Sequence, residues 1–569
     1  MQLVSVDLSE RDVKVSSIPE TWIREYIGGK GIATKLLYER LKPNTDPLSP
    51  DNIIIFGIGP VNGLTFPGAS RLTCVFKSPL TSAYGESQCG GFISREFGKS
   101  GIDFLLISGK ADKAVYIVIR NGEVGIKGAE HLWGRDTFET EEILRKDEGG
   151  EVLAIGQAGE NLVKFACISH RRGRQFGRAG AGAVMGSKML KAIVIDGDKK
   201  PEVAHPDELG EFRKKIAERA KEKLQSLSNY GTPGIMALTN EMGVLPTRYW
   251  SKGSFEGFEE INAEAVMRYV KKHTSCFGCP VACGLIVSAN GVEIEGPEYE
   301  TLYALGSLCE NRDLKAIFKA AELCDRYGMD TISAGNAIAF LMACSERGEV
   351  EDRVNFGDGE ATVDLIRKIA LREGIGNVLA EGTKRASEIL GTSVEPVHVK
   401  GLEPPGYDPR GLYGMALAYA VSPRGACHMR SCAYRPNLVG AVDRLSPDGQ
   451  AALVKDLEDM YCVVDSLVLC RFLCLPIIGP MFWEDLSELY RMVTGRKVTV
   501  EHLKKVGERI CNLTRAFNTR EGVKKDKLPE IFFKSPIKLY GRNMVIEKDD
   551  FERMLEEYYR LRGWEKGGD

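Results

Sequence analysis

The chain has 569 residues, of which 43% are hydrophobic and 27% are charged, so its composition is that of an ordinary globular protein. Its 76 Lys and Arg residues almost balance its 79 Asp and Glu residues, which gives a net charge of -3. The chain therefore lacks the surplus of basic residues that is typical of nucleic-acid-binding proteins, and its charge does not indicate that class. The number that needs an explanation is 15 cysteines, because an odd number cannot all pair within one chain.

The role of these cysteines depends on the compartment. Met1–Val15 shows no basic segment followed by an apolar run, so no export signal is predicted. The longest apolar run, near Phe472–Trp483, has about 12 residues, whereas a membrane helix needs about 20. We therefore expect a cytoplasmic protein without a membrane span, in which disulfides are uncommon and cysteines bind metal, act in catalysis or pack in the core. Packing is expected for Cys167, Cys309, Cys344 and Cys511.

Residues 1–203 are predicted to form a β-rich domain. Met1–Val15 has the pattern of a hairpin, and Ile32–Leu41 has the pattern of a helix. A polar stretch with prolines, Asp196–Pro206, marks the end of this domain. Six short apolar runs flanked by turn residues are predicted as strands: Ile53–Gly57, Leu72–Phe76, Leu105–Ser108, Ala114–Arg120, Val152–Ile155 and Ala192–Ile195.

Residues 204–404 and 405–569 are predicted to form two mainly helical domains, because apolar residues recur there at three- and four-residue spacing. The Pro- and Gly-rich segment Glu403–Gly411 separates the two. The fold class is therefore α+β, with a β-rich base followed by two helical domains. The expected helices are Glu208–Leu227, Ala263–Lys272, Asp313–Tyr327, Thr331–Arg347, Ala361–Arg372, Gly376–Leu390, Ala451–Asp465, Trp483–Thr494, Val500–Asn518 and Asp549–Leu561.

The densest cysteine motif is a C-x2-C-x3-C segment formed by Cys276, Cys279 and Cys283. Three thiolates at this spacing can converge on one metal centre, and both tetrahedral zinc and a [4Fe–4S] cluster need a fourth ligand. The candidate is Cys470, with Cys474 as the alternative. A cluster is favoured over zinc because the third cysteine follows closely and no second tight pair accompanies the trio. A buried cysteine-rich turn without metal is the structural alternative.

Further motifs occur in order along nearly the whole chain. They are Tyr26–Gly31, Phe76–Thr81, Gly90-Gly91, Gly156–Asn161, Gly180–Lys188, the cysteine trio, Gly296–Glu300, Asp325–Asp330, Asp465–Cys470 and Arg515–Gly522. In number and order they resemble the signatures of the tungsten-containing aldehyde:ferredoxin oxidoreductase family. The resemblance implies that the β-rich base and the two helical domains enclose a tungsten or molybdenum ion held by two pyranopterins, with a [4Fe–4S] cluster and a Mg²⁺ ion nearby.

The resemblance also implies which residues hold the cofactor. Two motifs of the form D-x-x-G-L-(D/C) would bind the pterins, through Asp325 and Asp330 in the first and Asp465 and Leu469 in the second. Carboxylates suit the amine donors of a pterin ring, although Asp325 and Asp330 could instead end one helix and cap the next. The phosphate and Mg²⁺ residues would be Arg71, Gln88, Cys89, Gly90, Gly91, Arg178, Ala179 and Gly180.

The chain departs from the family pattern at two positions. Gln88 stands where the family commonly has Asn, and Val468 stands where the second pterin motif usually has Gly. A contact made by a backbone carbonyl would survive the first change. If the usual glycine allows close approach of the backbone, the second change predicts a slightly different loop.

Aldehyde oxidation takes oxygen from water and releases protons, so an acid or base near the metal is expected. Glu300 matches the family's active-site glutamate, with Glu298 as an alternative two residues away. His428 matches the family's active-site histidine and is expected to bind the aldehyde oxygen or to move a proton. A buried structural histidine is the alternative for His428. The entrance is expected to be lined by Tyr407, Asp408 and Arg410.

The function implied is the reversible oxidation of a small aldehyde to its acid, with electrons passing through the cluster to ferredoxin or another low-potential carrier. Lys271 and Lys272, beside Cys276, are a candidate docking patch or else a solvated helix end. Both a homodimer and a complex with a small iron–sulfur subunit are compatible with the sequence. Two other interpretations are a benzoyl-CoA-reductase-type tungsten subunit and a pterin-free iron–sulfur or zinc protein for electron transfer or scaffolding.

Overall fold

The computed structural model describes residues 1–539 and 541–565. Its N-terminal part contains two six-stranded sheets, with strand orders β2-β1-β6-β3-β4-β5 and β11-β10-β9-β12-β7-β8. The strands of the first sheet are β1 (Gln2–Asp7), β2 (Asp12–Ser17), β3 (Ile54–Gly57), β4 (Leu72–Lys77), β5 (Tyr84–Cys89) and β6 (Phe104–Ser108). Those of the second are β7 (Val115–Arg120), β8 (Glu123–Gly128), β9 (Glu151–Ala154), β10 (Ile168–His170), β11 (Arg174–Phe176) and β12 (Leu190–Asp196).

The two sheets share one hydrophobic core, because alternate side chains of each strand point to opposite faces. From β3, Ile54 and Phe56 enter this core, and the Phe56 ring meets that of Phe176 on β11 with centroids 5.7 Å apart. Ile55 belongs to a second core, shared with α2 (Gly29–Arg40) and with later helices. The N-terminal part is therefore a sandwich whose first sheet presents one face to the rest of the chain.

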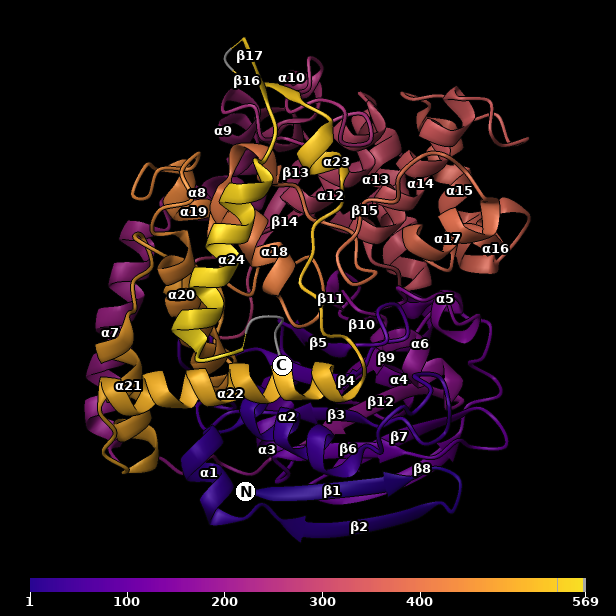
Figure 1. Ribbon diagram of the computed structural model, residues 1–569. Helices are drawn as coiled ribbons and strands as arrows, with labels where there is room; N and C mark the ends of the chain where they lie inside the picture. The colour runs from indigo at the N-terminus through magenta and orange to yellow at the C-terminus, as the bar shows by residue number, and fades with distance from the viewer. Residues whose placement is uncertain (540, 566–569) are drawn as a thin grey trace.

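The remaining chain is mainly helical and lies above this base in Figure 1. Short helices of the base are α1 (Glu20–Tyr26), α3 (Ile93–Lys99), α4 (Thr137–Asp147), α5 (Gln157–Glu160) and α6 (Ala181–Ser187). The next block contains α7 (Pro206–Lys223), α8 (Gln225–Tyr230), η1 (Thr232–Ile235), α9 (Met236–Glu241), α10 (Phe258–Ile261), α11 (Ala263–Met267), α12 (Tyr299–Leu305), η2 (Ser307–Cys309), α13 (Leu314–Tyr327), α14 (Thr331–Glu346), α15 (Gly359–Leu371), α16 (Ile375–Leu379) and α17 (Thr383–Leu390).

The last block contains η3 (Pro409–Gly411), α18 (Tyr413–Val421), α19 (Tyr434–Leu438), α20 (Gln450–Leu467), η4 (Arg471–Cys474), α21 (Trp483–Thr494), α22 (Val500–Arg520), α23 (Ile531–Lys534) and α24 (Lys548–Arg562). Two small sheets complete the structure. They are formed by β13 (Val270–Thr274), β14 (Gly284–Ala289) and β15 (Val292–Glu295), and by β16 (Ile537–Leu539) and β17 (Arg542–Met544). No helix among the described residues is both long and apolar enough to cross a membrane.

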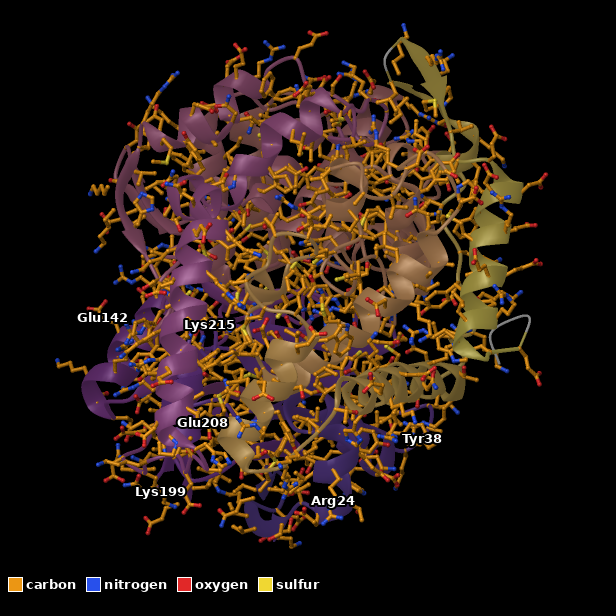
Figure 2. The ribbon with its side chains drawn as sticks, turned by 90° about the vertical axis from the view of Figure 1, so that its left-hand side faces the viewer. Arg24, Tyr38, Glu142, Lys199, Glu208 and Lys215 are labelled. Carbon is orange, nitrogen blue, oxygen red and sulfur yellow. The ribbon has the colours of Figure 1, made fainter. Side chains whose placement is uncertain are left out.

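Helix α7 shows how the apolar spacing of the sequence becomes packing. Its residues Leu209, Phe212 and Ile216 follow each other at three- and four-residue intervals and are buried. The charged Glu208 and Lys215 of the same helix are exposed, as Figure 2 shows from the side of the molecule. The helix is therefore held by one apolar stripe.

The predicted α+β fold, with a β-rich base followed by helical blocks, is confirmed, and all six predicted strands and the N-terminal hairpin are present. The helix predicted over Ala263–Lys272 is wrong at its end, because α11 ends at Met267 and β13 pairs with β14 instead. The helix predicted over Gly376–Leu390 is two helices, since Gly382 between them has φ +83°. The boundaries near residues 203 and 404 remain predictions.

The base contacts the last block through glycines that have no room for a side chain. Gly28 and Gly59 lie against the last turn of α20, where a Cβ on either residue would approach the carbonyl oxygen of Ser466 to 3.0 and 2.6 Å. Ser466 also accepts a hydrogen bond from the N–H of Gly31 at 3.1 Å through its hydroxyl oxygen. The glycines of the base therefore fix the end of α20, from which the chain continues to Cys470.

We expect Gly59→Ala to lower the free energy of unfolding by about 1–3 kcal/mol, since the added methyl group would collide with the backbone at Ser466 and Leu467. Gly210→Ala is the matched control. Gly210 lies within α7, and a methyl group added there would meet no atom within 4 Å, so alanine should raise stability by about 0.5–1 kcal/mol. Denaturant unfolding measures both, and equal effects of the two substitutions would contradict the close approach.

Candidate functional site

A cavity of about 700 Å³ lies where the base meets the two helical blocks. The base contributes Arg71 and Gln88 to its wall, the middle block contributes Asp325, and the last block contributes His428 and Cys470. Residues that are far apart in sequence therefore meet around one space that is large enough for a sizeable cofactor.

All four predicted cluster cysteines line this cavity. Cys276, Cys279 and Cys283 lie on the loop between β13 and β14, and Cys470 follows the end of α20. Two glycine-containing loops of the base hold them. The N–H of Gly91 donates to Sγ of Cys276 at 3.2 Å, and the N–H of Cys470 donates to the carbonyl oxygen of Gly68 at 2.9 Å. The alternative ligand, Cys474, is buried and is not among the residues that line the cavity.

The electrostatics of the cysteine group favour a bound cation. Burial, together with the neighbouring thiol of Cys470, raises the pKa of Cys279 to about 11 and that of Cys283 well above its ordinary value. Thiolates are the metal-binding form, and a cationic centre would bring these pKa values down. In the part of the chain that the structure describes, no three His, Cys, Asp or Glu side chains are grouped closely enough to share a single metal ion.

Arginines dominate the rest of the wall. The cavity is lined by seven of them, against five carboxylates: Arg71, Arg174, Arg178, Arg424, Arg430, Arg435 and Arg471, and Glu295, Glu298, Glu300, Asp325 and Asp330. Arg424 and Arg430 flank His428 in the sequence, and this arginine-rich context is a signal for the cavity that the family motifs do not include. Arg174 and Arg471 follow no recognisable pattern, because only the fold brings them to the cavity.

Two of these arginines, Arg430 and Arg471, belong to a buried network of charged side chains that has more positive than negative charges. The Lys30 Nζ lies 3.0 Å from a Glu86 carboxylate oxygen, and Arg430 contacts both Glu86 and Asp465. Arg471 donates from Nε to Asp465 at 2.9 Å. Burial alone would raise the pKa of Asp465, but Arg471, Arg430 and Lys30 outweigh it and lower that pKa to about 2. The network thus contains three cations and two anions. Burial, together with the charge of the nearby Arg471, lowers the pKa of Arg430 to about 9.

Several polar atoms of the wall are buried without a partner. They include Nε of Arg71, Arg424, Arg430 and Arg435, the side-chain nitrogen of Gln88, Oε1 of Glu300 and Nδ1 of His428. Buried donors without acceptors are costly, so this wall suits a group with many acceptor atoms. The excess of positive charge favours an anionic group. A pterin cofactor with phosphates meets both conditions.

The predicted cofactor residues separate into two groups. Arg71, Gln88, Gly90, Arg178, Asp325 and Asp330 line the cavity, whereas Cys89, Gly91, Ala179, Gly180, Asp465 and Leu469 are absent from its lining. Several members of the second group form hydrogen bonds with neighbouring residues instead. The Asp465 carboxylate binds Arg471, the Gly91 N–H binds Cys276, and the carbonyl oxygen of Ala179 accepts from the Ser78 hydroxyl at 2.8 Å.

Arg178 and Asp330 are largely occupied within the protein. Arg178 donates to Asp330 at 2.9 Å and to the carbonyl oxygens of Ala426 and Glu403 at 3.1 and 2.8 Å. The carboxylate of Asp330 also caps α14 by accepting from the N–H of Ile332 at 3.0 Å. The helix-cap role considered for Asp330 is confirmed, and Arg178 has few N–H groups left for a phosphate.

The two pterin motifs share one backbone conformation. Asp325 and Asp465 each lie in the last turn of a helix, and Gly328 and Val468 end those helices with left-handed φ values of +73° and +58°. The predicted difference from the family's loop at Val468 stays a prediction, because Gly328 belongs to the other motif of this same chain. A β-branched residue rarely adopts this conformation, and here its buried side chain packs on Gly29. The motif keeps its backbone shape without its glycine.

Glu300 and His428 face each other at one part of the cavity. The Nε2 of His428 lies 3.6 Å from Oε1 of Glu300, whose other oxygen accepts from the N–H of Gly406 at 2.9 Å. Burial raises the pKa of Glu300 to about 8. Burial and the charges of Arg178, Arg424 and Arg471 lower the pKa of His428 well below its ordinary value. Near neutral pH the pair therefore holds its proton on Glu300 and keeps the imidazole neutral.

The rival carboxylate, Glu298, is exposed and accepts a hydrogen bond from the Thr232 hydroxyl at 2.5 Å. Aromatic rings surround the buried pair instead. The Tyr407 ring lies 5.7 Å from that of His428 and stacks on Tyr434 at 4.1 Å. Of the three residues predicted at the entrance, Tyr407 lines the cavity, and the prediction is wrong for the other two. Asp408 and Arg410 are fully buried in an ion pair with each other.

Comparison with known proteins identifies the family. The aldehyde ferredoxin oxidoreductase N-terminal domain matches residues 3–197, and domains 2 and 3 of the same family match residues 209–569. The tungsten-containing aldehyde ferredoxin oxidoreductase of Pyrococcus furiosus is 36% identical, over 100% of this chain and 96% of its own. That of Thermococcus kodakarensis is 34% identical over the same shares of the two chains.

More distant relatives are named for other activities. The aliphatic sulfonate oxidoreductase, WOR-like subunit, of Pyrococcus furiosus is 29% identical over 100% of this chain and 95% of its own. The solved active-site complex BamBC of benzoyl-coenzyme A reductase, with 1,5-dienoyl-CoA, has a TM-score of 0.86 and 25% identity, and covers 99% of this chain and 94% of that one. Fold and matches define the chain as an oxidoreductase. It belongs to the aldehyde ferredoxin oxidoreductase family.

The positive excess of the buried network gives a prediction for Arg430→Met. The substitution leaves Lys30 paired with Glu86 and Arg471 paired with Asp465, so the charges balance. In protein produced without tungstate or molybdate, we expect unchanged or higher stability, by up to about 1–4 kcal/mol, together with weaker retention of metal when tungstate is supplied.

Arg562→Met is the control for this experiment. Arg562 is also buried, but it pairs with two carboxylates, Glu458 and Asp459, away from the cavity. Its loss should destabilise the chain by about 3–5 kcal/mol and leave metal content per folded chain unchanged. Thermal unfolding and metal analysis of both variants test the charge argument, and a large destabilisation by Arg430→Met would contradict it.

Proposed function

We propose that the chain oxidises aldehydes reversibly to carboxylic acids at a tungsten bis-pyranopterin centre and passes the electrons through a [4Fe–4S] cluster to ferredoxin. The observation that carries the proposal is the single cavity in which four cysteines, an arginine-rich wall and the buried Glu300–His428 pair meet. The relatives that are 34–36% identical over the whole chain are named for this activity and for tungsten, which supports the proposal.

Each part of the wall would have its own role in holding the cofactors. Cys276, Cys279, Cys283 and Cys470 would bind the cluster. Arg71 and the other arginines with free N–H groups would meet the pterin phosphates, and the oxygens near Gln88 would meet Mg²⁺. Asp325 would accept from a pterin ring. The bound centre would supply the two-electron chemistry, while the protein supplies orientation and electrostatics.

Glu300 and His428 would handle the substrate oxygen and the protons. With the proton on Glu300, its O–H faces Nε2 of His428, which lies 3.6 Å from Oε1, and would donate to it once the two groups approach. The imidazole would then carry its own hydrogen on Nδ1, which has no partner among the described residues. That N–H can donate to the carbonyl oxygen of the aldehyde and polarise it. The Tyr407 and Tyr434 rings lie against the imidazole and give it an apolar side.

Two related activities are alternatives, because members of the wider group are named as a sulfonate oxidoreductase subunit and as a benzoyl-coenzyme A reductase complex. The aldehyde assignment is favoured by the higher identity of the aldehyde-oxidising relatives and by the paired Glu300 and His428. A substrate panel containing aldehydes, an aliphatic sulfonate and benzoyl-CoA separates the three.

The test is anaerobic purification with elemental analysis, followed by that panel with a low-potential dye as electron acceptor. The proposal expects tungsten together with about four irons per chain, and turnover of aldehydes. Zinc alone, or full metal with no aldehyde turnover, would contradict it. If molybdenum is found in place of tungsten, the proposed reaction stands and only the identity of the metal changes, since both metals bind the same dithiolene sulfurs.

The pH dependence of kcat/KM follows from the Glu300–His428 pair. As the pH rises through about 8, Glu300 loses its proton, and its carboxylate then draws the imidazole hydrogen to Nε2. The donor at Nδ1 is lost, so the rate should fall above about pH 8. Glu300→Gln should abolish this limb, because a glutamine amide does not titrate, and should lower the rate at pH 7 by about 10²–10⁴-fold. Glu298→Gln, which alters the exposed rival, should leave the profile unchanged.

The choice of the fourth cluster ligand is tested by Cys470→Ser and Cys474→Ser. Cys470 lines the cavity with the other three cysteines, whereas Cys474 is buried away from it. We expect the first variant to lose most of its iron and its iron–sulfur absorbance, and the second to keep both. Iron content in the reverse order would show that Cys474 is the ligand.

A further inference from the structure

The cysteines Cys462 and Cys511 lie in sulfur–sulfur contact at a place remote from the cluster motif in the sequence. Cys462 is on α20 and Cys511 is on α22, and their Sγ atoms are 3.3 Å apart. Both are free thiols. The sequence assigns Cys511 a packing role only, since the two positions are separated by 49 residues and the contact depends on the packing of the two helices.

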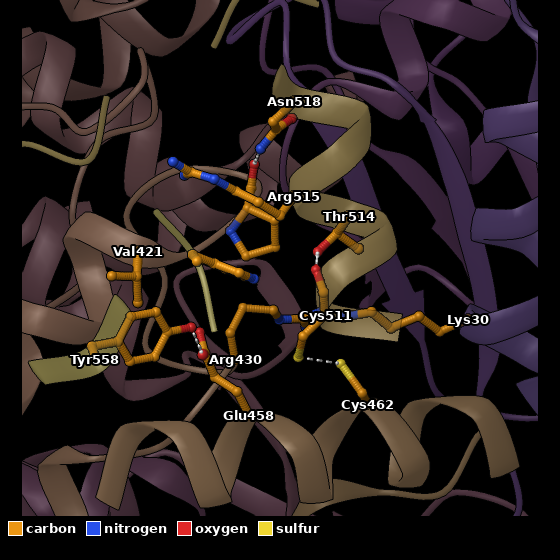
Figure 3. A pocket seen from close by; sticks show the side chains of 12 residues that line it. Lys30, Val421, Arg430, Glu458, Cys462, Cys511, Thr514, Arg515, Asn518 and Tyr558 are labelled. Atoms are coloured by element: carbon orange, nitrogen blue, oxygen red, sulfur yellow. Dashed lines mark hydrogen bonds between the residues drawn. The ribbon is translucent and has the colours of Figure 1, made fainter. Parts of the chain in front are cut away.

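The pair borders its own small cavity, of about 20 Å³, shown in Figure 3. Lys30, Arg430, Thr514 and Tyr558 are among the other residues that line it. A cavity of this size admits a molecule of about the size of water. The two sulfurs are therefore buried but adjoin a space that a very small polar reactant can occupy.

We propose that Cys462 and Cys511 form a peroxide-reactive dithiol that closes to a disulfide between α20 and α22. The sulfur atoms need to approach from contact distance to the bond length of about 2.05 Å, a small movement for two packed helices. Cys309 is the contrasting case: among the described residues its sulfur has hydrogen-bond contacts to the carbonyl oxygens of Ala304 and Gly335 and none to a second cysteine.

Cys462 is the attacking sulfur. Either sulfur can donate the hydrogen bond that joins the two, and this bond, with the charge of Lys30, lowers the pKa of Cys462 despite its burial. The same interaction raises the pKa of Cys511 well above its ordinary value. With Cys462 as the thiolate and Cys511 as the thiol, one sulfur can attack and the other can resolve.

The reaction has two balanced steps. The Cys462 thiolate attacks one oxygen of hydrogen peroxide, the O–O bond breaks, and the leaving hydroxide takes a proton to become water while Cys462 becomes a sulfenic acid. The Cys511 sulfur then attacks the Cys462 sulfur, the S–OH bond breaks, and the hydroxyl leaves as water with the Cys511 proton. Two thiols and one peroxide give one disulfide and two waters, and the sulfurs lose the two electrons that peroxide gains.

The disulfide would act on the helix that ends at the cofactor cavity. Cys462 lies about one turn before Asp465, which holds Arg471 in the cavity wall. Linking α20 to α22 at this position restrains the turn that carries Asp465 and leads to Cys470. The dithiol thus lies on the helix that leads to the cofactor cavity, where its oxidation can affect the cavity wall.

The test uses the anaerobically purified full-length holoenzyme and equimolar hydrogen peroxide. Remaining thiols are alkylated under denaturing conditions, and peptides from a non-reducing digest are identified by mass spectrometry. We expect the Cys462–Cys511 linked peptide as the first disulfide product, with loss of both free thiols and recovery by dithiothreitol. Full alkylation of both cysteines while others oxidise would overturn the proposal.

Variants identify the roles of the two sulfurs and control for burial. Cys511→Ser should leave a Cys462 sulfenic acid that dimedone traps, and Cys462→Ser should give no trapped Cys511. Cys309→Ser should behave as the unsubstituted protein. A trapped Cys511 with an unreactive Cys462 would overturn the assignment. The peptide map of the unsubstituted chain decides whether the Cys462–Cys511 disulfide forms. This result stands even if a variant fails to fold, and it does not depend on which substrate the enzyme uses.

Discussion

The rest of the structure depends on an excess of buried positive charge around one cavity. Among the described residues, the buried Lys30, Arg430 and Arg471 form ion pairs with only Glu86 and Asp465, and further arginines face the cavity with unpaired Nε–H groups. An uncompensated buried charge costs several kcal/mol, so an anion in the cavity would stabilise the folded chain. Under the proposed function this anion is the cofactor, and the base and the helical blocks surround the cavity that would hold it.

The same charge explains the chemistry of the Glu300–His428 pair. Arg178, Arg424 and Arg471 oppose protonation of the imidazole, while burial keeps the proton on the carboxyl group. The positive charges around the cavity therefore have two effects. They favour an anionic cofactor, and together with burial they determine that Glu300 rather than His428 holds the proton near neutral pH. An anion in the cavity would offset part of that field, so cofactor binding and the proton affinity of the pair are linked.

The sequence was sufficient for the fold class, for six strands of the base and for most helices, because their apolar spacing matches their burial. It failed at β13, where pairing with β14 overrides a helical pattern, and at β5, whose polar residues lie in a buried strand. Motifs placed the four cysteines, Glu300 and His428 around one cavity. They could not find Arg174, Arg471 or the Cys462–Cys511 contact, because these depend on which distant segments the fold brings together.

The central claim is that a pterin-containing anion neutralises the buried arginines. The most direct measurement is the pterin and organic phosphate content of anaerobically purified protein, determined together with tungsten. The account predicts pterin and phosphate in equal amounts, bound in proportion to tungsten and retained through gel filtration. Correctly folded protein that carries the iron of a cluster but neither pterin nor organic phosphate would contradict it.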